Sequence, residues 1–282
     1  MKLLPRRSPF WSHPVRTGFA AAAALVFASW ACADELVTLK TRPGATQSVL
    51  FWEPHGPSPE TVILLVPGGP GNIGLKLKEG RAQTEGVHLF SHQREALLQG
   101  QFAVAVIDAP SDQKDMTQDF RMSAKHVTDM QAVLREIRSR FPKARLVLVG
   151  HSRGTVSVGT ISQNFDDQVG AIVLLSGLYQ ASQPSAQITS GGPGLSKIDL
   201  PSLRIPVLLV HHAHDACPIA PFAATATVST RLPMITVDGA ATGDSDLLCG
   251  PGSTHWFAGM ERAVGQEVLN WLSGKAWKPA VP

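Results

Sequence analysis

Five short runs of consecutive apolar residues most constrain what this chain can fold into. The runs cover residues 62–66, 102–107, 146–149, 171–175 and 206–210. Continuous apolar runs of this length are typical of strands that are buried on both faces, as in a parallel sheet that helices cover from either side. Purely antiparallel sheets with one wet face would instead show alternating polar and apolar positions.

Helical patterns separate these runs. Residues 119–141 form the clearest one, because apolar side chains recur there on one helical face at Met122, Val127, Met130, Leu134 and Ile137. A last helix is predicted over roughly residues 258–273, and two short strands over residues 36–40 and 48–52. Buried strands that alternate with amphipathic helices predict the α/β class: a three-layer α/β/α sandwich with a mainly parallel sheet.

The first 33 residues have the pattern of a secretory signal peptide. A leader with four basic residues precedes an apolar run over residues 19–30, and Ala31-Cys32-Ala33 fits a small-residue cleavage site. A membrane anchor is the alternative, but spanning a bilayer takes about 20 residues. We therefore predict a signal peptide over residues 1–33, a single domain over residues 34–282, export to the periplasm or medium, and no stable membrane insertion after cleavage.

Removal of that segment changes the electrostatic character of the chain. The full chain has 25 basic and 22 acidic residues, and the segment contains four of the basic and none of the acidic ones. The mature chain would carry a net charge of −1, so no basic face for nucleic acid is predicted. Cys32 leaves with the segment, and an exported chain favours pairing of the remaining Cys217 and Cys249.

A candidate nucleophile follows the run at residues 146–149. Gly150-His151-Ser152-Arg153-Gly154 matches G-x-S-x-G, and it lies between a predicted buried strand and a helix-compatible segment. In such a strand–turn–helix elbow the serine takes a strained backbone conformation, and the two glycines let the strand and helix pack closely. The alternative is a turn serine that only caps the helix. The context favours Ser152 as a nucleophile.

A serine hydroxyl needs a base within hydrogen-bond reach and a carboxylate that orients the base. His255, in a Gly-rich loop before the last predicted helix, is the candidate base, and a purely structural histidine is the alternative. Asp215, just after the run at 206–210, is the candidate acid, since the chain order on such a fold is Ser, acid, His. The alternative acids are Asp108, Asp238, Asp244 and Asp246.

Two backbone N–H groups are needed to bind the oxyanion of a tetrahedral intermediate. Arg153, the residue after the nucleophile, is one predicted donor. The other is Gly69, in the Pro67-Gly68-Gly69-Pro70-Gly71 loop after the first buried run, with Gly71 as the second choice because Pro70 has no N–H. A Gly/Pro turn with no catalytic part is the alternative. The Arg153 side chain is expected either to face the substrate or to pair with a carboxylate.

Together these motifs resemble the α/β-hydrolase family. The PGGPG loop, the GHSRG elbow, the late aspartate and the terminal histidine occur in that family's order over nearly the whole mature chain. The loop is similar to the HGGPG of proline iminopeptidases, with Pro67 in place of His, which weakens any transfer of peptidase specificity. The resemblance implies a serine hydrolase that needs no cofactor. A large cap is not expected, because residues 180–202 are short and polar.

The stretch HHAHDACP, residues 211–218, offers a rival interpretation as a metal site. It is superficially similar to the H-x-H-x-D-H zinc run of metallo-β-lactamase-type hydrolases, but Asp215 directly follows the second histidine and no histidine comes after it. We predict no metal there and assign the histidines no role. A Cys217–Cys249 disulfide would instead join the acid loop to the base loop, stabilising the fold by about 3–4 kcal/mol.

The sequence thus predicts an exported serine hydrolase that acts on a small-molecule acyl substrate. Carboxylesterase or thioesterase activity is favoured over serine aminopeptidase activity. Two further alternatives are a non-catalytic binding protein with the same fold and a metallohydrolase. The sequence does not indicate an oligomeric state.

Overall fold

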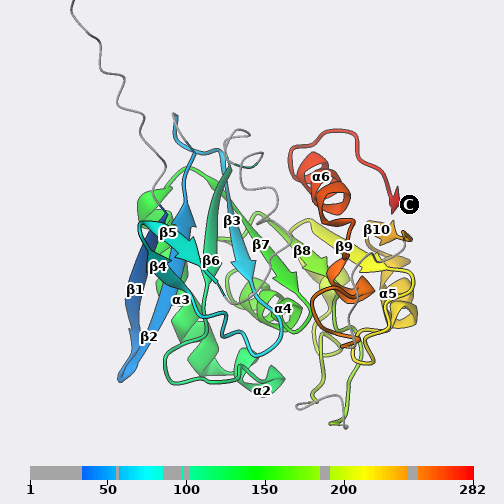
Figure 1. The fold of residues 1–282 in the computed structure, drawn as a ribbon, viewed down its shortest axis with the longest axis horizontal. Helices are drawn as coiled ribbons and strands as arrows, with labels where there is room; N and C mark the ends of the chain where they lie inside the picture. Colours follow the sequence, from blue (N-terminus) through cyan, green and yellow to red (C-terminus); the bar gives the residue numbers. More distant parts are fainter. Residues whose placement is uncertain (1–33, 55–56, 85–96, 98–101, 185–190, 240–246) are drawn as a thin grey trace, which may run out of the picture. The chain divides into compact units, whose positions relative to one another are not determined.

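The computed structural model describes residues 34–54, 57–84, 97, 102–184, 191–239 and 247–282 (Figure 1). The predicted signal peptide at residues 1–33 lies outside the described residues. The division into a signal peptide and one domain over residues 34–282 therefore stays a prediction.

One sheet organises the described residues. Its nine strands lie in the order β1-β2-β6-β3-β7-β8-β9-β10-β11 (Figure 1). Their bounds are β1 Glu35–Arg42, β2 Ala45–Trp52, β3 Thr61–Val66, β6 Phe102–Ile107, β7 Arg145–His151, β8 Ala171–Leu175, β9 Val207–His212, β10 Met234–Val237 and β11 Ala280–Val281. A separate hairpin pairs β4 Lys76–Lys78 with β5 Arg81–Gln83. All pairs from β6 to β11 are parallel, whereas β2 pairs antiparallel with both β1 and β6, which confirms the mainly parallel sheet.

The helices lie between the strands as the alternating pattern predicts. Those with bounds inside the described residues are α2 Gln118–Arg121, α3 Ala124–Arg140, α4 Gly154–Asn164, α5 Phe222–Ser229 and α6 Glu261–Leu272. The helix predicted over residues 119–141 is two helices, because the Ser123 side chain accepts the His126 amide and so begins a new helix. The last helix starts at Glu261 rather than near 258, since Phe257 takes a left-handed conformation with φ 54°.

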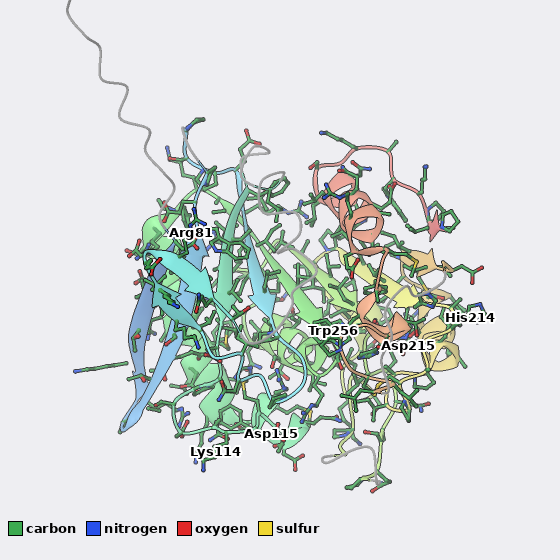
Figure 2. The ribbon with its side chains drawn as sticks, viewed as in Figure 1. Arg81, Lys114, Asp115, His214, Asp215 and Trp256 are labelled. Carbon is green, nitrogen blue, oxygen red and sulfur yellow. A yellow bond between two sulfur atoms is a disulfide. The ribbon has the colours of Figure 1, made fainter. Side chains whose placement is uncertain are left out.

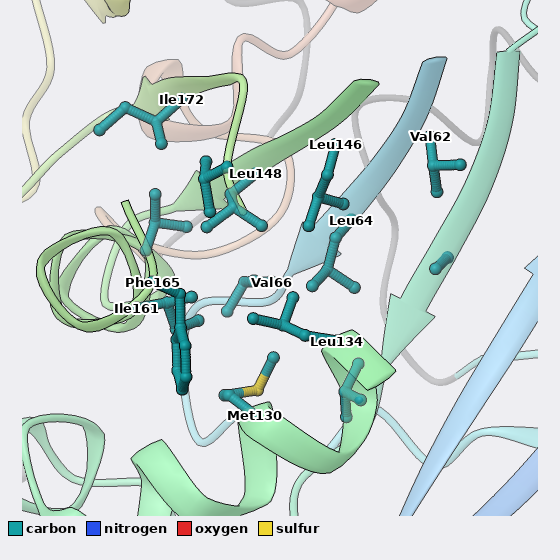
Figure 3. Close-up of a cluster of buried hydrophobic side chains, with 14 of the residues drawn as sticks. Val62, Leu64, Val66, Met130, Leu134, Leu146, Leu148, Ile161, Phe165 and Ile172 are labelled. Atoms are coloured by element: carbon teal, nitrogen blue, oxygen red, sulfur yellow. The ribbon is translucent and has the colours of Figure 1, made fainter. Parts of the chain in front are cut away.

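Two apolar cores cover the two faces of the sheet, which makes the structure three-layered. Side chains of β3 alternate between them: Leu64 packs with α3 and α4 on one face, and Ile63 packs with α6 on the other. Figure 3 shows the first core, where Met130 and Leu134 of α3 and Ile161 of α4 meet the sheet. Each fully buried side chain of this kind contributes about 1.5–3 kcal/mol.

The carboxyl ends of the parallel strands bring three loops to one edge of the sheet. These loops follow β3, β7 and β9, and they contain the predicted oxyanion loop, nucleophile and acid respectively. Between β8 and β9, the described residues hold only a short 3-10 helix, Leu200–Ser202. That segment packs on α4, since a Cβ on Gly159 would lie 2.6 Å from Ile198 and 2.7 Å from Leu195. The described part of the excursion therefore forms no cap.

None of the described helices combines the length and apolar character needed to cross a membrane.

Candidate active site

Ser152 occupies a sharp turn between β7 and α4. Its φ is 53°, in the left-handed region that side chains rarely adopt, at a cost of about 1–3 kcal/mol. The turn is held by its backbone: the Ser152 N–H donates to the Leu175 carbonyl at 2.9 Å, and the Thr155 N–H and hydroxyl both donate to the Ser152 carbonyl, at 2.9 and 2.6 Å. The structure thus forms the strained elbow that the G-x-S-x-G motif predicts.

Three glycines make this turn possible because other backbone lies against them. A Cβ on Gly150 would be 2.7 Å from the Gly154 carbonyl oxygen, and one on Gly154 would be 2.2 Å from the Val66 carbonyl oxygen. A Cβ on Gly68 would be 2.9 Å from Ser152 Cβ. The loop after β3 therefore lies directly against the nucleophile, and only hydrogen fits between them.

Asp215 and His255 are hydrogen-bonded to each other. The distance from His255 Nδ1 to Asp215 Oδ2 is 2.8 Å, and both side chains are fully buried. Asp215 Oδ1 accepts the Cys217 N–H at 2.9 Å. Burial would raise the pKa of Asp215, but the hydrogen bonds from His211 and His255 and their charges outweigh it and lower the pKa well below its usual range. Asp215 is therefore an anion that can orient His255.

The other ring nitrogen of His255 is the atom that a general base uses. Because Nδ1 donates to a carboxylate, Nε2 of the neutral ring is an acceptor. Nε2 is buried and makes no hydrogen bond to any described residue, so the Ser152–His255 hydrogen bond itself is not formed here. The main chain of His255 is nevertheless anchored next to the nucleophile, since its carbonyl accepts from His151 Nε2 at 2.9 Å and Ser176 Oγ at 2.8 Å.

The alternative acids have other partners or lie outside the described residues. Asp108 accepts the backbone N–H groups of residues 73, 75 and 109, which is a structural role. Asp238 pairs with the exposed His214 at 2.9 Å. Asp244 and Asp246 are outside the part of the chain that the structure describes. Among the described candidates, Asp215 alone bonds to His255.

The histidines of residues 211–218 have distinct surroundings. His211 Nε2 lies 3.1 Å from Asp215 Oδ2 and 2.9 Å from the Ala220 carbonyl oxygen, both acceptors, so Nε2 carries a proton. Its Nδ1 lies 2.8 Å from the Thr225 hydroxyl oxygen. His211 is thus a second histidine on the Asp215 carboxylate, a contact that the sequence analysis missed when it assigned these histidines no role. No periodic pattern signals this contact, because His211 lies in β9 and Asp215 in the loop after it.

A disulfide joins the two loops that carry Asp215 and His255. Cys217 and Cys249 are bonded, with Cα atoms 4.7 Å apart. The Thr254 hydroxyl adds a second tie by donating to the His214 carbonyl at 2.9 Å. Figure 2 labels Asp215 and Trp256, the residue after His255, whose indole N–H donates to the Cys249 carbonyl at 3.0 Å. The acid and base loops are therefore held together covalently as well as by hydrogen bonds.

The loop at residues 67–71 has N–H groups near the nucleophile at Gly68, Gly69 and Gly71, and those of Gly68 and Gly69 are not engaged by described residues. The Gly71 N–H donates to the Gly68 carbonyl at 3.0 Å and so is already engaged, which makes the second-choice donor unsuitable. The Gly69 N–H forms no hydrogen bond with a described residue. Arg153 directly follows the nucleophile, and its guanidinium pairs with Asp115 at 3.0 Å. Of the two expectations for this side chain, pairing with a carboxylate is therefore the one observed.

Arg121 is a buried cation next to this loop that sequence reasoning did not find. It is fully buried at the end of α2, and Nη2 lies 3.3 Å from the Gly69 carbonyl oxygen. Burial and the like charge of Arg153 lower the pKa of Arg121 to about 9, although the charge of Asp115 opposes the shift. The guanidinium is therefore charged at neutral pH.

Comparisons with known proteins agree with this architecture. Residues 61–192 match the family model described as the alpha/beta hydrolase fold. No curated protein sequence matches the chain. Three solved structures are similar at low identity. An α/β serine hydrolase homologue from Coxiella burnetii has 15% identity and a TM-score of 0.57, over 86% of this chain and 100% of that one.

The second is an α/β serine hydrolase without a lid from Xanthomonas campestris, with 13% identity and a TM-score of 0.54, over 88% of this chain and 97% of that one. The third is Est1E from Butyrivibrio proteoclasticus, with 14% identity and a TM-score of 0.59, over 85% of this chain and 98% of that one. The chain therefore has the α/β-hydrolase fold, and the resemblance predicted from its motifs is confirmed.

Proposed function

We propose that the chain is an exported serine hydrolase that cleaves an ester or a related acyl substrate through an acyl-enzyme intermediate. The observation that carries this proposal is the buried Asp215–His255 pair at 2.8 Å, whose Nε2 accepts from no described residue. The His255 carbonyl is anchored by His151, the residue before the strained Ser152 with φ 53°. A strained serine, an imidazole oriented by a carboxylate and a free Gly69 N–H are the parts that acyl transfer requires.

In the proposed mechanism Ser152 Oγ attacks the acyl carbon while its proton passes to His255 Nε2. Asp215 accepts the Nδ1 proton in a hydrogen bond throughout and stabilises the imidazolium. The carbonyl oxygen becomes an oxyanion, bound by the N–H groups of Gly69 and Arg153. His255 then donates its proton to the leaving group, and the carbon–oxygen bond of the ester breaks.

The second half repeats these steps with water. His255 Nε2 takes a proton from a water molecule, whose oxygen attacks the acyl-enzyme. The second tetrahedral intermediate collapses, the acid product leaves, and the proton returns to Ser152 Oγ. With that one water molecule, both halves balance using only the side chains and backbone groups named above and the acyl substrate.

Structural neighbours support esters ahead of peptides as the substrate class. They include Est1E, also solved with ferulic acid bound, and a cold-adapted esterase from an Arctic metagenomic library, at 16% identity each and TM-scores of 0.56 and 0.53. The disulfide supports export, because disulfides persist in oxidising compartments. A thioester substrate shares the same acyl chemistry and belongs to the same test.

The test is hydrolysis of a panel of esters, thioesters, lactones and aminoacyl amides by the purified protein. We expect turnover of short acyl esters, loss of that turnover in Ser152→Ala, and no effect of a chelator. Ser162→Ala is the matched control, since Ser162 lies on α4, the helix that follows Ser152, with its hydroxyl bonded to the Val158 carbonyl at 2.8 Å. Turnover of aminoacyl amides alone would favour the aminopeptidase alternative. Activity retained in Ser152→Ala would overturn the proposal.

Export has a separate test. Protein recovered from outside the cytoplasm should begin near residue 34, as measured by intact mass. Recovery only of the full-length chain inside the cell would refute export without affecting the hydrolase proposal.

A further inference from the structure

Arg121 is a fully buried charge that no described carboxylate neutralises by direct contact. Its guanidinium donates to the Met116 carbonyl at 2.9 Å, to Ser157 Oγ at 2.9 Å and to the Gly69 carbonyl at 3.3 Å. Buried charges are normally paired with opposite charges, because removing a charge from water is unfavourable. Neutral acceptors alone are therefore an unusual set of partners, and they suggest a use for the charge.

Two of these acceptors belong to the two segments that carry the proposed oxyanion donors. Gly69 lies in the loop after β3, and Ser157 lies in the first turns of α4, whose start follows Arg153. The approach is close, since a Cβ on Gly71 would lie 2.9 Å from Arg121 Nη2. The guanidinium thus spans the gap between the loop and the nucleophile helix.

The third acceptor strengthens the connection to the loop. Met116 accepts Nε of Arg121 through its carbonyl, and its own N–H donates to the Pro70 carbonyl at 2.7 Å. Arg121 therefore holds the loop both directly and through Met116. The planar fork of arginine makes these simultaneous contacts, which a lysine ammonium on a flexible stem would not reproduce.

We propose that Arg121 is the positioning residue of the oxyanion hole: it fixes the Gly69 loop against α4 so that two N–H groups converge on one oxygen, and it places a positive charge behind them. This inference rests on the proposed function. An oxyanion donor acts only when it lies about 2.7–3.1 Å from the developing charge, so a loop that shifts loses most of its effect.

The charge of Arg121 favours the transition state over the bound substrate. Before reaction, Arg121 has no direct carboxylate partner among the described residues, and the nearby Asp115 carboxylate contacts Arg153 at 3.0 Å. The oxyanion supplies negative charge only in the transition state, so the attraction strengthens as the reaction proceeds. An interaction of this kind raises kcat and leaves KM nearly unchanged.

The test compares Arg121→Met, Arg121→Lys and Ser157→Ala with wild type. For each, kcat, KM and the inhibition constant of a trifluoromethyl ketone are measured, since this inhibitor forms an oxyanion adduct with a serine nucleophile. We expect Arg121→Met to lower kcat about 100-fold with little change in KM, and to weaken the ketone by a similar factor. For Arg121→Lys, kcat and ketone affinity should lie between those of Arg121→Met and wild type. Ser157→Ala should lower kcat less than either Arg121 variant.

Arg138→Met is the matched control. Arg138 also bridges two segments through carbonyl oxygens, those of Ala144 at 2.6 Å and Gln168 at 2.5 Å, but these precede β7 and β8 at the opposite end of the strands. It should lose thermal stability and keep kcat and ketone affinity. If Arg121→Met does not fold, Arg121→Lys and Ser157→Ala still decide the matter through the same two measurements.

Two outcomes would overturn the inference. One is a kcat within threefold of wild type in Arg121→Met or, failing that variant, in both of the others. Another is a loss of kcat without any loss of ketone affinity, which would indicate a role other than oxyanion binding. Either result alongside Ser152-dependent hydrolysis in wild type leaves the proposed function intact, whereas absence of Ser152-dependent hydrolysis removes both.

Discussion

Loss of the Cys217–Cys249 disulfide should lower the free energy of unfolding by an amount that depends on the number of residues between the two cysteines. The two cysteines are 32 residues apart, and in the loop-entropy account a cross-link of that span restricts the unfolded chain by about 3.7 kcal/mol at 25 °C. For a domain of this size each kcal/mol shifts the melting temperature by about 2–4 °C. Reduction should therefore lower Tm by about 7–15 °C.

Thermal unfolding of oxidised and reduced wild type measures this directly, because reduction changes no residue. The double variant Cys217→Ala with Cys249→Ala should melt near the reduced protein and should not respond to reductant, which controls for effects of the reductant itself. A shift below about 2 °C, or two free thiols in the unreduced protein by intact mass, would refute the reasoning.

The catalytic effect of reduction should be smaller than its effect on stability. The 2.8 Å bond between His255 and Asp215 and the 2.9 Å bond from Thr254 to His214 still join the two loops in the reduced protein. We expect kcat at 25 °C to fall by only a few-fold. A complete loss of activity in reduced, folded protein would show that the disulfide itself orients the acid and base.

Three further predictions follow from single contacts. Gly154→Ala should destabilise the fold by about 3 kcal/mol or prevent folding, because its Cβ would lie 2.2 Å from the Val66 carbonyl oxygen; near-normal denaturant unfolding would contradict this. His211→Leu removes a hydrogen bond to the charged Asp215 worth about 1.5–3 kcal/mol, so kcat should fall at least about tenfold, and unchanged kinetics would exclude a positioning role. The folded-state pKa of Asp215 lies below the ordinary value of 3.8, so the ionised carboxylate stabilises the fold above pH 3.8 and this stabilisation is lost as the pH falls below it. Between pH 5 and pH 3 the free energy of unfolding, measured by chemical denaturation, should therefore fall less in Asp215→Asn than in wild type. An equal fall in both proteins would refute the assignment.

The sheet could be predicted from the sequence where strands are buried on both faces. β3, β6, β7, β8 and β9 are each nearly all apolar, and such runs carry their own signal. β10, β11 and the β4–β5 hairpin were not predicted, because they are short and partly exposed and therefore show no apolar run. The break between α2 and α3 depends on one side-chain cap at Ser123, which a periodic pattern does not reveal.

The candidate site also combines residues that a local pattern predicts with residues that only long-range contacts bring together. Ser152 lies in a local motif, and Asp215 and His255 follow from chain order, so their places could be predicted. Arg121 reaches Gly69 across 52 residues and Ser157 across 36, contacts that no local pattern encodes. The choice between Gly69 and Gly71 likewise needed the turn itself, since one hydrogen bond engages the Gly71 N–H.

Covalent labelling of Ser152 tests the central claim most directly. The mature protein is treated with a fluorophosphonate, and the modified peptide is identified by mass spectrometry alongside Ser152→Ala and the Ser162→Ala control. We predict one adduct per chain, on Ser152, in wild type and in the control, with none in Ser152→Ala. No adduct, or an adduct on another residue together with ester hydrolysis in Ser152→Ala, would contradict the assignment of Ser152 as the nucleophile.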